Sequence, residues 1–180
     1  MKYSYKEALK IYGSRYKIQK AINQGTLFKH TRNVYSNDEN TNELDIITVK
    51  YPYAIFTLNS AYYFHDLTDV IPRYNYIAIE EHTKINKKEG FVLTYMRKDL
   101  HELGITTLET HNAVIRVYDL EKLLIELVRN RNSFGYDYYK EIINNYREIS
   151  KELDIQKLSE YLDFYKNRDN ILIKIQNEVF

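Results

Sequence analysis

The sequence predicts an α+β fold, with a small N-terminal winged helix-turn-helix followed by a mixed α/β domain that ends in a helical bundle. Three observations favour this order. Two short helix signals meet at a glycine near the start, strand-like segments fill the middle, and helical periodicity runs from residue 119 onward. The 180 residues include 44% hydrophobic residues, enough to build a core, which excludes a disordered chain.

The start of the chain carries two helix signals. Ser4 and Glu7 have the spacing of a capping box, and Gly13 supplies the left-handed residue that ends a helix. A second helix is expected to open at Ser14 and to end at Gly25. Two short helices joined across one glycine-containing turn are typical of a helix-turn-helix.

Residues 26–36 resemble two short strands around a turn at residues 31–33, which would form a β-wing. A polar segment at residues 37–43 follows, and then a helix that ends before Pro52. We expect the winged domain to be abridged, because no helix signal precedes these two in the sequence. The predicted domains are an abridged winged helix-turn-helix at 1–36, a connecting polar segment and helix at 37–50, and an α+β domain at 51–180.

The middle of the chain is expected to form short strands around one helix. The elements are a strand at 54–56, a helix at 58–65, strands at 75–79 and 91–95 separated by a polar loop at 80–89, and a hairpin of 105–108 with 113–117 through 109–112.

The last third of the sequence has the periodicity of amphipathic helices. Asp119 and Asp154 are the expected N-caps of two of them, and residues 139–146 form the apolar stripe of a helix between these two. The last helix is expected to bury Leu172, Ile175 and Val179. Together these helices form the predicted bundle.

Charge is distributed unevenly along the chain. Residues 1–36 hold eight cations and one anion, a net charge of +7, which leaves −6 for residues 37–180 because the whole chain carries +1. A basic end on an acidic body favours a polyanion as the partner of that end.

The second helix offers an outward face for such a partner. With Ile18 facing inward at 100° per residue, Ala21 and Ile22 also face inward, and polar side chains face outward. Arg, Gln, Lys and Asn can bond to base edges and phosphates in a major groove, and cations on the wing can bond to phosphates. The candidate DNA-binding residues are Ser14, Arg15, Tyr16, Gln19, Lys20, Asn23, Lys29 and Arg32, with His30 beside them on the wing.

Catalytic motifs are missing from the sequence. Gly13-Ser14 is similar to the start of a nucleotidyltransferase signature, but the next acids, Asp38 and Glu39, lie in a polar segment, so no metal-binding aspartate pair follows. The five histidines lack HxH and HxxxH spacing, and there is no GxSxG elbow or GxxxxGK[ST] loop. We expect no enzyme activity, no cofactor and no metal; a hydrolase or nuclease would require a bound metal.

Composition also limits the location of the protein. The sequence has no cysteine, which excludes disulfides, thiolate metal sites and a cysteine nucleophile. Met1 is followed by Lys2 and Tyr3 rather than by an apolar run, and no apolar run is long enough for a transmembrane helix. We expect a cytoplasmic protein without a membrane partner.

The order of several segments resembles the AbiEi-type abortive-infection antitoxin family, the regulatory halves of type IV toxin–antitoxin pairs. One departure is Asn33, where the family often has glycine, although asparagine tolerates a left-handed conformation. The matching residues are Tyr12-Gly13-Ser14, Lys20-Ala21-Ile22, Gly25 and Val34-Tyr35-Ser36 at the start; Tyr51-Pro52, Ala54-Ile55-Phe56, Ser60-Ala61, Tyr63 and 65–68 in the centre; and 116–122, 129–132 and 158–161 near the end.

The resemblance implies a transcriptional autorepressor that binds the double-stranded operator DNA of its own operon. It also implies that the protein is an antitoxin in phage defence. It would oppose a nucleotidyltransferase toxin encoded beside it, without forming a stable complex with that toxin. A small winged domain gains affinity by binding repeated half-sites in pairs, so a homodimer on DNA fits this interpretation. The alternative is a protein-interaction module in which residues 50–180 bind a partner and the basic end does not bind DNA.

Overall fold

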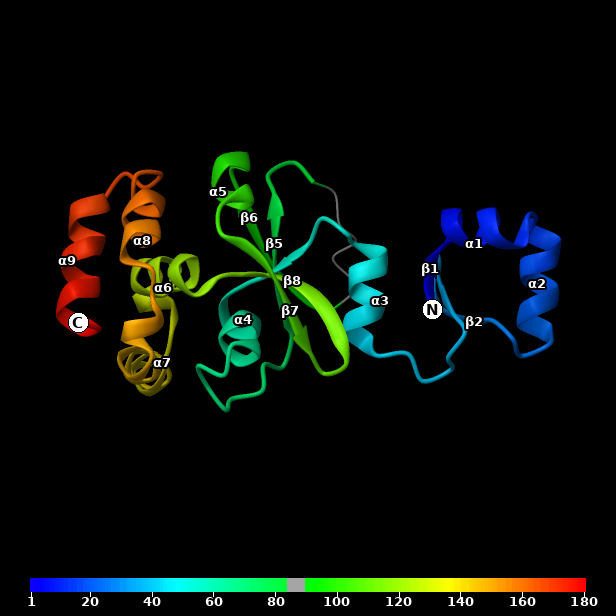
Figure 1. Cartoon of the computed structure of the whole chain (residues 1–180), viewed down its shortest axis with the longest axis horizontal. Coiled ribbons are helices and arrows are strands. Elements are labelled where there is room, and N and C mark those ends of the chain that lie inside the picture. Colours follow the sequence, from blue (N-terminus) through cyan, green and yellow to red (C-terminus); the bar gives the residue numbers. More distant parts are fainter. Residues whose placement is uncertain (84–89) are drawn as a thin grey trace. The chain divides into compact units, whose positions relative to one another are not determined.

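A computed structural model describes residues 1–83 and 90–180, and its fold is α+β, as the sequence predicts (Figure 1). The chain divides into two compact units. The first contains residues 1–54 and 109–115, and the second contains residues 55–108 and 116–180. The predicted polar loop at 80–89 lies largely outside the described residues.

The first unit contains a three-stranded antiparallel sheet and three helices. The strand order is β1 (Lys2–Ser4), β3 (Val34–Ser36) and β2 (Phe28–Thr31). The helices are α1 (Tyr5–Tyr12), α2 (Arg15–Asn23) and α3 (Glu43–Lys50). Helices α1 and α2 share a core with strand β3, which is formed by Ala8, Ile18, Ala21, Leu27 and Tyr35.

Local signals set the limits of α1, as predicted. The Ser4 hydroxyl accepts a hydrogen bond from the Glu7 N–H, and the Glu7 carboxylate accepts one from the Ser4 N–H at 2.8 Å. Gly13 then ends the helix with φ at 79°. Glycine adopts this left-handed conformation at little cost, because it has no side chain. Both helices of the predicted pair, and both strands of the predicted wing, are present at the expected places.

Strand β1 was not predicted, because its three residues are too short for a periodic pattern. It is held by pairing with β3, in which Tyr3 lies opposite Tyr35. The side chain of Lys2 forms an ion pair with the buried carboxylate of Asp45 in α3. Long-range partners therefore fix the first residues of the described structure.

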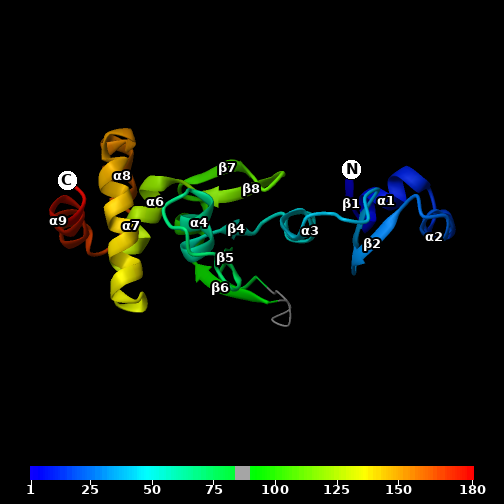
Figure 2. The ribbon, with the colours of Figure 1, turned by 90° about the horizontal axis from the view of Figure 1, so that it is seen from below.

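The second unit is built on a five-stranded sheet of mixed direction, of which residues 109–115 belong to the first unit. Its strand order is β6 (Phe91–Met96), β5 (Asn75–Glu80), β4 (Ile55–Phe56), β8 (Ala113–Tyr118) and β7 (Ile105–Thr110). Strand β5 is parallel to β6 and antiparallel to β4, whereas β4 is parallel to β8. Figure 2 shows β5 beside β6 and β7 beside β8. The turn of the β7–β8 hairpin is formed by His111 and Asn112, both with positive φ.

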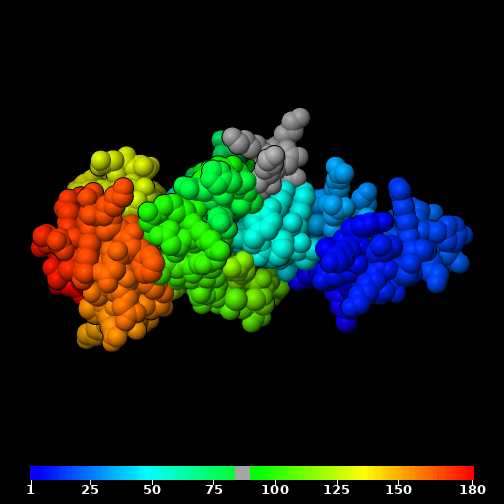
Figure 3. All heavy atoms as spheres, turned by 90° about the horizontal axis from the view of Figure 1, so that it is seen from above, coloured from blue at the N-terminus to red at the C-terminus, as the bar shows by residue number. Residues whose placement is uncertain are grey.

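The helices of this unit are α4 (Leu58–Phe64), α5 (Lys98–Glu102), α6 (Leu120–Arg129), α7 (Tyr136–Glu148), α8 (Ile155–Leu162) and α9 (Arg168–Glu178), with 3-10 turns at Arg131–Ser133 and Ser150–Glu152. Helix α6 is central, because α4, α8 and α9 all pack against it. Figure 3 shows α8 and α9 (orange to red) side by side on the surface.

Two details of the helical region differ from prediction. Helix α5 was not predicted. In α9 the buried side chains are Ile171, Ile175 and Val179, and Leu172 is only half-buried. The stripe predicted for α9 therefore began one residue too late, because Leu172 and Ile171 are both apolar and the sequence does not say which faces α6. No helix in the described part of the chain is long and apolar enough to cross a membrane.

Candidate nucleic-acid interface

The orientation of α2 is set by its cap and its apolar side. The Ser14 hydroxyl accepts a hydrogen bond from the Lys17 N–H at 3.2 Å, which starts the helix directly after the Gly13 turn. Ile18 and Ala21 are buried in the core of the unit. The side of α2 that carries the predicted DNA-binding residues is therefore left at the surface.

All the predicted residues of α2 itself are exposed, and Ser14 before it is half-buried. The Tyr16 side chain, although aromatic, is 77% exposed. The Gln19 side-chain N–H donates to the side-chain Oδ1 of Asn23 at 3.0 Å, one turn along the helix. This amide pair keeps a free acceptor on Gln19 and a free donor on Asn23, the combination that adenine and other base edges require. The exposed residues are Arg15, Tyr16, Gln19, Lys20 and Asn23.

The wing residues are arranged less uniformly. Lys29 on β2 and Arg32 in the following turn are exposed, and Asn33 in that turn has φ at 71°. His30 is half-buried instead, and its Nε2 lies 2.8 Å from the Ser36 hydroxyl. Two of the three wing candidates are therefore available to phosphates, and His30 is engaged within the unit.

The positive charge of this region is largely uncompensated. Lys2 is paired with Asp45, but none of the other seven cations of residues 1–36 forms an ion pair with any described residue, and all seven are exposed. The one acid, Glu7, has its pKa lowered by hydrogen bonds from the Ser4 backbone and side chain, so it stays ionised within the capping box. The seven cations are Lys6, Lys10, Arg15, Lys17, Lys20, Lys29 and Arg32.

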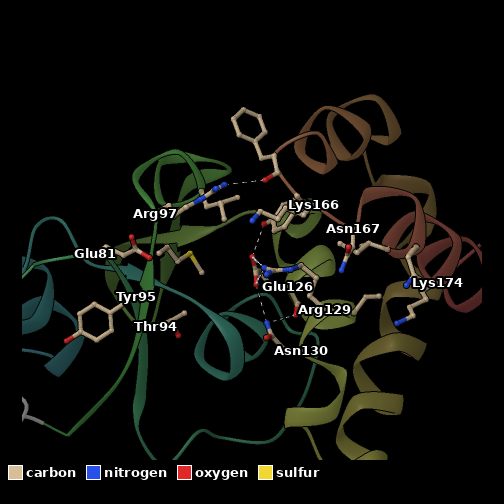
Figure 4. Close-up of a pocket in the computed structure, with 17 residues that line it drawn as sticks. Glu81, Thr94, Tyr95, Arg97, Glu126, Arg129, Asn130, Lys166, Asn167 and Lys174 are labelled. Atoms are coloured by element: carbon tan, nitrogen blue, oxygen red, sulfur yellow. Dashed lines mark hydrogen bonds and ion pairs between the residues drawn. The ribbon is translucent and has the colours of Figure 1, made fainter.

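A cavity of about 700 Å³ in the second unit was not found from the sequence. Its walls come from β6, the end of α6 and the start of α9, with polar side chains from all three (Figure 4). These residues are spread from position 81 to position 174, so no local motif signals their proximity. Within residues 1–83 and 90–180, no group of three or more His, Asp or Glu side chains could hold a metal ion.

The candidate interface therefore consists of the exposed side of α2 and the wing turn, with the cations placed on one small unit. The sequence matches no protein-family model, and no curated protein is significantly similar to it. The chemistry of these residues is thus the main guide to what they bind.

Proposed function

We propose that this protein is a DNA-binding transcriptional autorepressor and the antitoxin of a type IV toxin–antitoxin system. In this proposal α1 and α2 form a helix-turn-helix, and β2 and β3 form its wing. The observation that carries the DNA-binding part is the exposed polar side of α2, in a unit whose residues 1–36 hold seven exposed cations that pair with no described acid. Duplex DNA supplies the closely spaced negative charges that such a surface requires.

Within this proposal, α2 enters the major groove and the wing turn follows the backbone. The amides of Gln19 and Asn23, with Arg15 at the start of the helix, reach base edges and give sequence preference. Lys20, Lys29 and Arg32 neutralise phosphates and fix the register without reading sequence. The whole surface is small, so two copies on repeated half-sites would add affinity.

Replacing Arg15 and Lys20 by alanine is expected to weaken duplex binding by at least about tenfold at low salt, because two phosphate or base contacts are lost. The slope of log K against log salt should fall by about 0.9, since Lys20 is the phosphate contact of the two and each phosphate contact contributes about 0.9. Fluorescence anisotropy over a salt series measures both quantities, first with a random-sequence duplex and then with the promoter DNA of the gene.

The matched control replaces Lys140 and Lys151, two exposed lysines of the second unit, by alanine. This control removes the same total charge but leaves α2 intact. An equal loss of affinity in both double variants would show that net charge alone drives the binding. Unchanged affinity and salt slope in the Arg15 and Lys20 variant would refute the proposed interface.

The antitoxin part of the proposal is supported by the resemblance to AbiEi-type antitoxins. The central and C-terminal matching segments lie mostly in the second unit, whereas α2 and the wing belong to the first. If the second unit opposes a nucleotidyltransferase toxin, the two activities should be separable by substitution.

We expect the variant with alanine at Arg15 and Lys20 to lose repression of its own promoter while it still protects cells that express the neighbouring nucleotidyltransferase. A promoter–reporter assay and a growth assay in the same strain measure the two activities. Loss of both activities with normal protein level would mean that toxin control depends on DNA binding. Protection with no promoter binding by the unaltered protein would favour the protein-interaction module instead.

A further inference from the structure

The cavity of the second unit is lined by more basic than acidic side chains. Its four cations are Arg97, Arg129, Lys166 and Lys174, and its two acids are Glu81 and Glu126. Figure 4 shows Arg129 and Glu126 on the α6 side, with Asn167 and Lys174 on the α9 side. The volume of about 700 Å³ lies within the range of small-molecule sites, roughly 300–1,000 Å³.

Arg129 is held in place by its surroundings. One of its terminal nitrogens lies 3.1 Å from each oxygen of the buried Glu126 carboxylate, and its guanidinium lies 4.6 Å from the centroid of the Tyr165 ring. The Arg129 side chain remains 38% exposed, and its other two guanidinium nitrogens donate to no described residue. A fixed guanidinium with free donors is well suited to a phosphate, because little side-chain entropy is lost on binding.

Glu126 does not cancel the charge of the cavity. Its carboxylate also lies 3.3 Å from the ammonium group of Lys122, which is fully buried, so two cations share one acid. Lys166 and Lys174 are exposed and form no hydrogen bond or ion pair with any described residue. Arg97 is already engaged with Asp99 at 2.9 Å. The unpaired positive charge is therefore concentrated on the α6 and α9 sides.

The start of α9 adds donors on the same side. This helix has eleven residues, and its N-cap residue Asn167 makes no side-chain capping bond. Asn167, Asn170 and Lys174 have the spacing of one helix face and line the cavity together. The amides offer donors and acceptors beside the two lysines, and the helix dipole favours an anion in this place.

We propose that this cavity binds a phosphate-bearing small molecule of nucleotide size. Its phosphates would lie between Arg129, Lys166 and Lys174, and its remaining polar groups would face the asparagine amides. A concave site of this volume fits a free ligand better than the outside of a duplex, which needs an extended surface. The site is separate from the α2 side chains proposed to bind DNA, so the two proposals can fail independently.

Isothermal titration calorimetry of the full chain with sodium tripolyphosphate, ATP and adenosine tests the proposal. We expect tripolyphosphate and ATP to bind and adenosine to bind far more weakly, because the phosphates carry the recognition. Replacing Lys166 and Lys174 by alanine should weaken ATP binding at least about tenfold, since two charge-assisted contacts are lost. The control with alanine at Lys140 and Lys151 should bind ATP as the unaltered protein does.

Several results would overturn the proposal. These are no binding of tripolyphosphate or ATP at millimolar concentration and low salt, equal binding of adenosine and ATP, or ATP binding that survives in the Lys166 and Lys174 variant. Loss of ATP binding in the Arg15 and Lys20 variant would place the polyanion on α2 instead. A drop in duplex affinity in the Lys166 and Lys174 variant, with ATP binding unchanged, would assign this surface to DNA.

Discussion

Replacement of Glu126 by leucine is expected to lower the free energy of unfolding of the second unit by about 3–5 kcal/mol, the range measured when one partner of a buried ion pair is removed. Glu126 is 3% exposed, and its carboxylate accepts a hydrogen bond from the Tyr165 hydroxyl at 2.7 Å. It also faces the ammonium group of the fully buried Lys122 at 3.3 Å. Without the carboxylate, Lys122 is left as an uncompensated charge in the core.

A double-mutant cycle separates this explanation from a simple loss of packing. Replacing Lys122 by methionine together with Glu126 by leucine removes both charges and keeps the apolar volume. We expect the double variant to recover most of the lost stability, because buried pairs are often replaceable by apolar residues of similar size. Urea unfolding followed by circular dichroism measures each variant. Additive costs for the two substitutions would contradict a direct interaction.

The pH dependence gives a second test of the same pair. Burial lowers the pKa of Lys122, and the Glu126 carboxylate opposes this effect, so its removal should lower that pKa further. Between the folded and unfolded pKa values the unfolded chain binds more protons, and stability therefore rises with pH. The cost of the Glu126 substitution should thus shrink from pH 7 to pH 9.5, by up to about 1.4 kcal/mol per pH unit. A cost independent of pH would mean that Lys122 remains protonated.

The parts of the fold that the sequence predicts are those fixed by neighbouring residues. Ser4, Asp119 and Asp154 cap helices through their own backbone neighbours three residues on, so the signal is complete within one turn. The exposed side of α2 was also predicted from local information. Once Ile18 is taken to face the core, the regular rotation of a helix sets the direction of every other side chain. Whether that side binds DNA stays a prediction.

The elements that were missed depend on distant partners. Strand β1 exists because Lys2–Ser4 pairs with Val34–Ser36, and three residues carry no periodic pattern of their own. The amphipathic periodicity after Asp119 predicted one buried side of α6, but the polar residues Lys122 and Glu126 are buried as well, because both α8 and α9 pack against this helix. The cavity beside them arises from the same packing and so could not be predicted.

Gly104 is the position at which a single added methyl group should cost most. Its φ is 70°, and an added Cβ would lie 2.7 Å from the Cβ of Lys122 and 2.9 Å from a carboxylate oxygen of Asp119. That carboxylate caps α6 and also accepts a hydrogen bond from the Tyr161 hydroxyl at 2.9 Å. The Gly104 carbonyl in turn accepts from the Asp119 N–H at 2.8 Å. The space for a side chain is therefore closed by atoms that cannot move separately.

We expect Gly104→Ala to destabilise the second unit by about 2–5 kcal/mol, as the sum of backbone strain of about 1–2 kcal/mol and overpacking of about 1–3 kcal/mol. Gly90→Ala is the matched control, because Gly90 has a similar φ of 73° but no described atom within 4 Å of its Cβ position. This control should cost only the backbone strain. Urea midpoints of the two variants measure the difference in stability. Equal costs would mean that α6 and its cap shift to accommodate the methyl group. The Asp119 contacts would then not close this site.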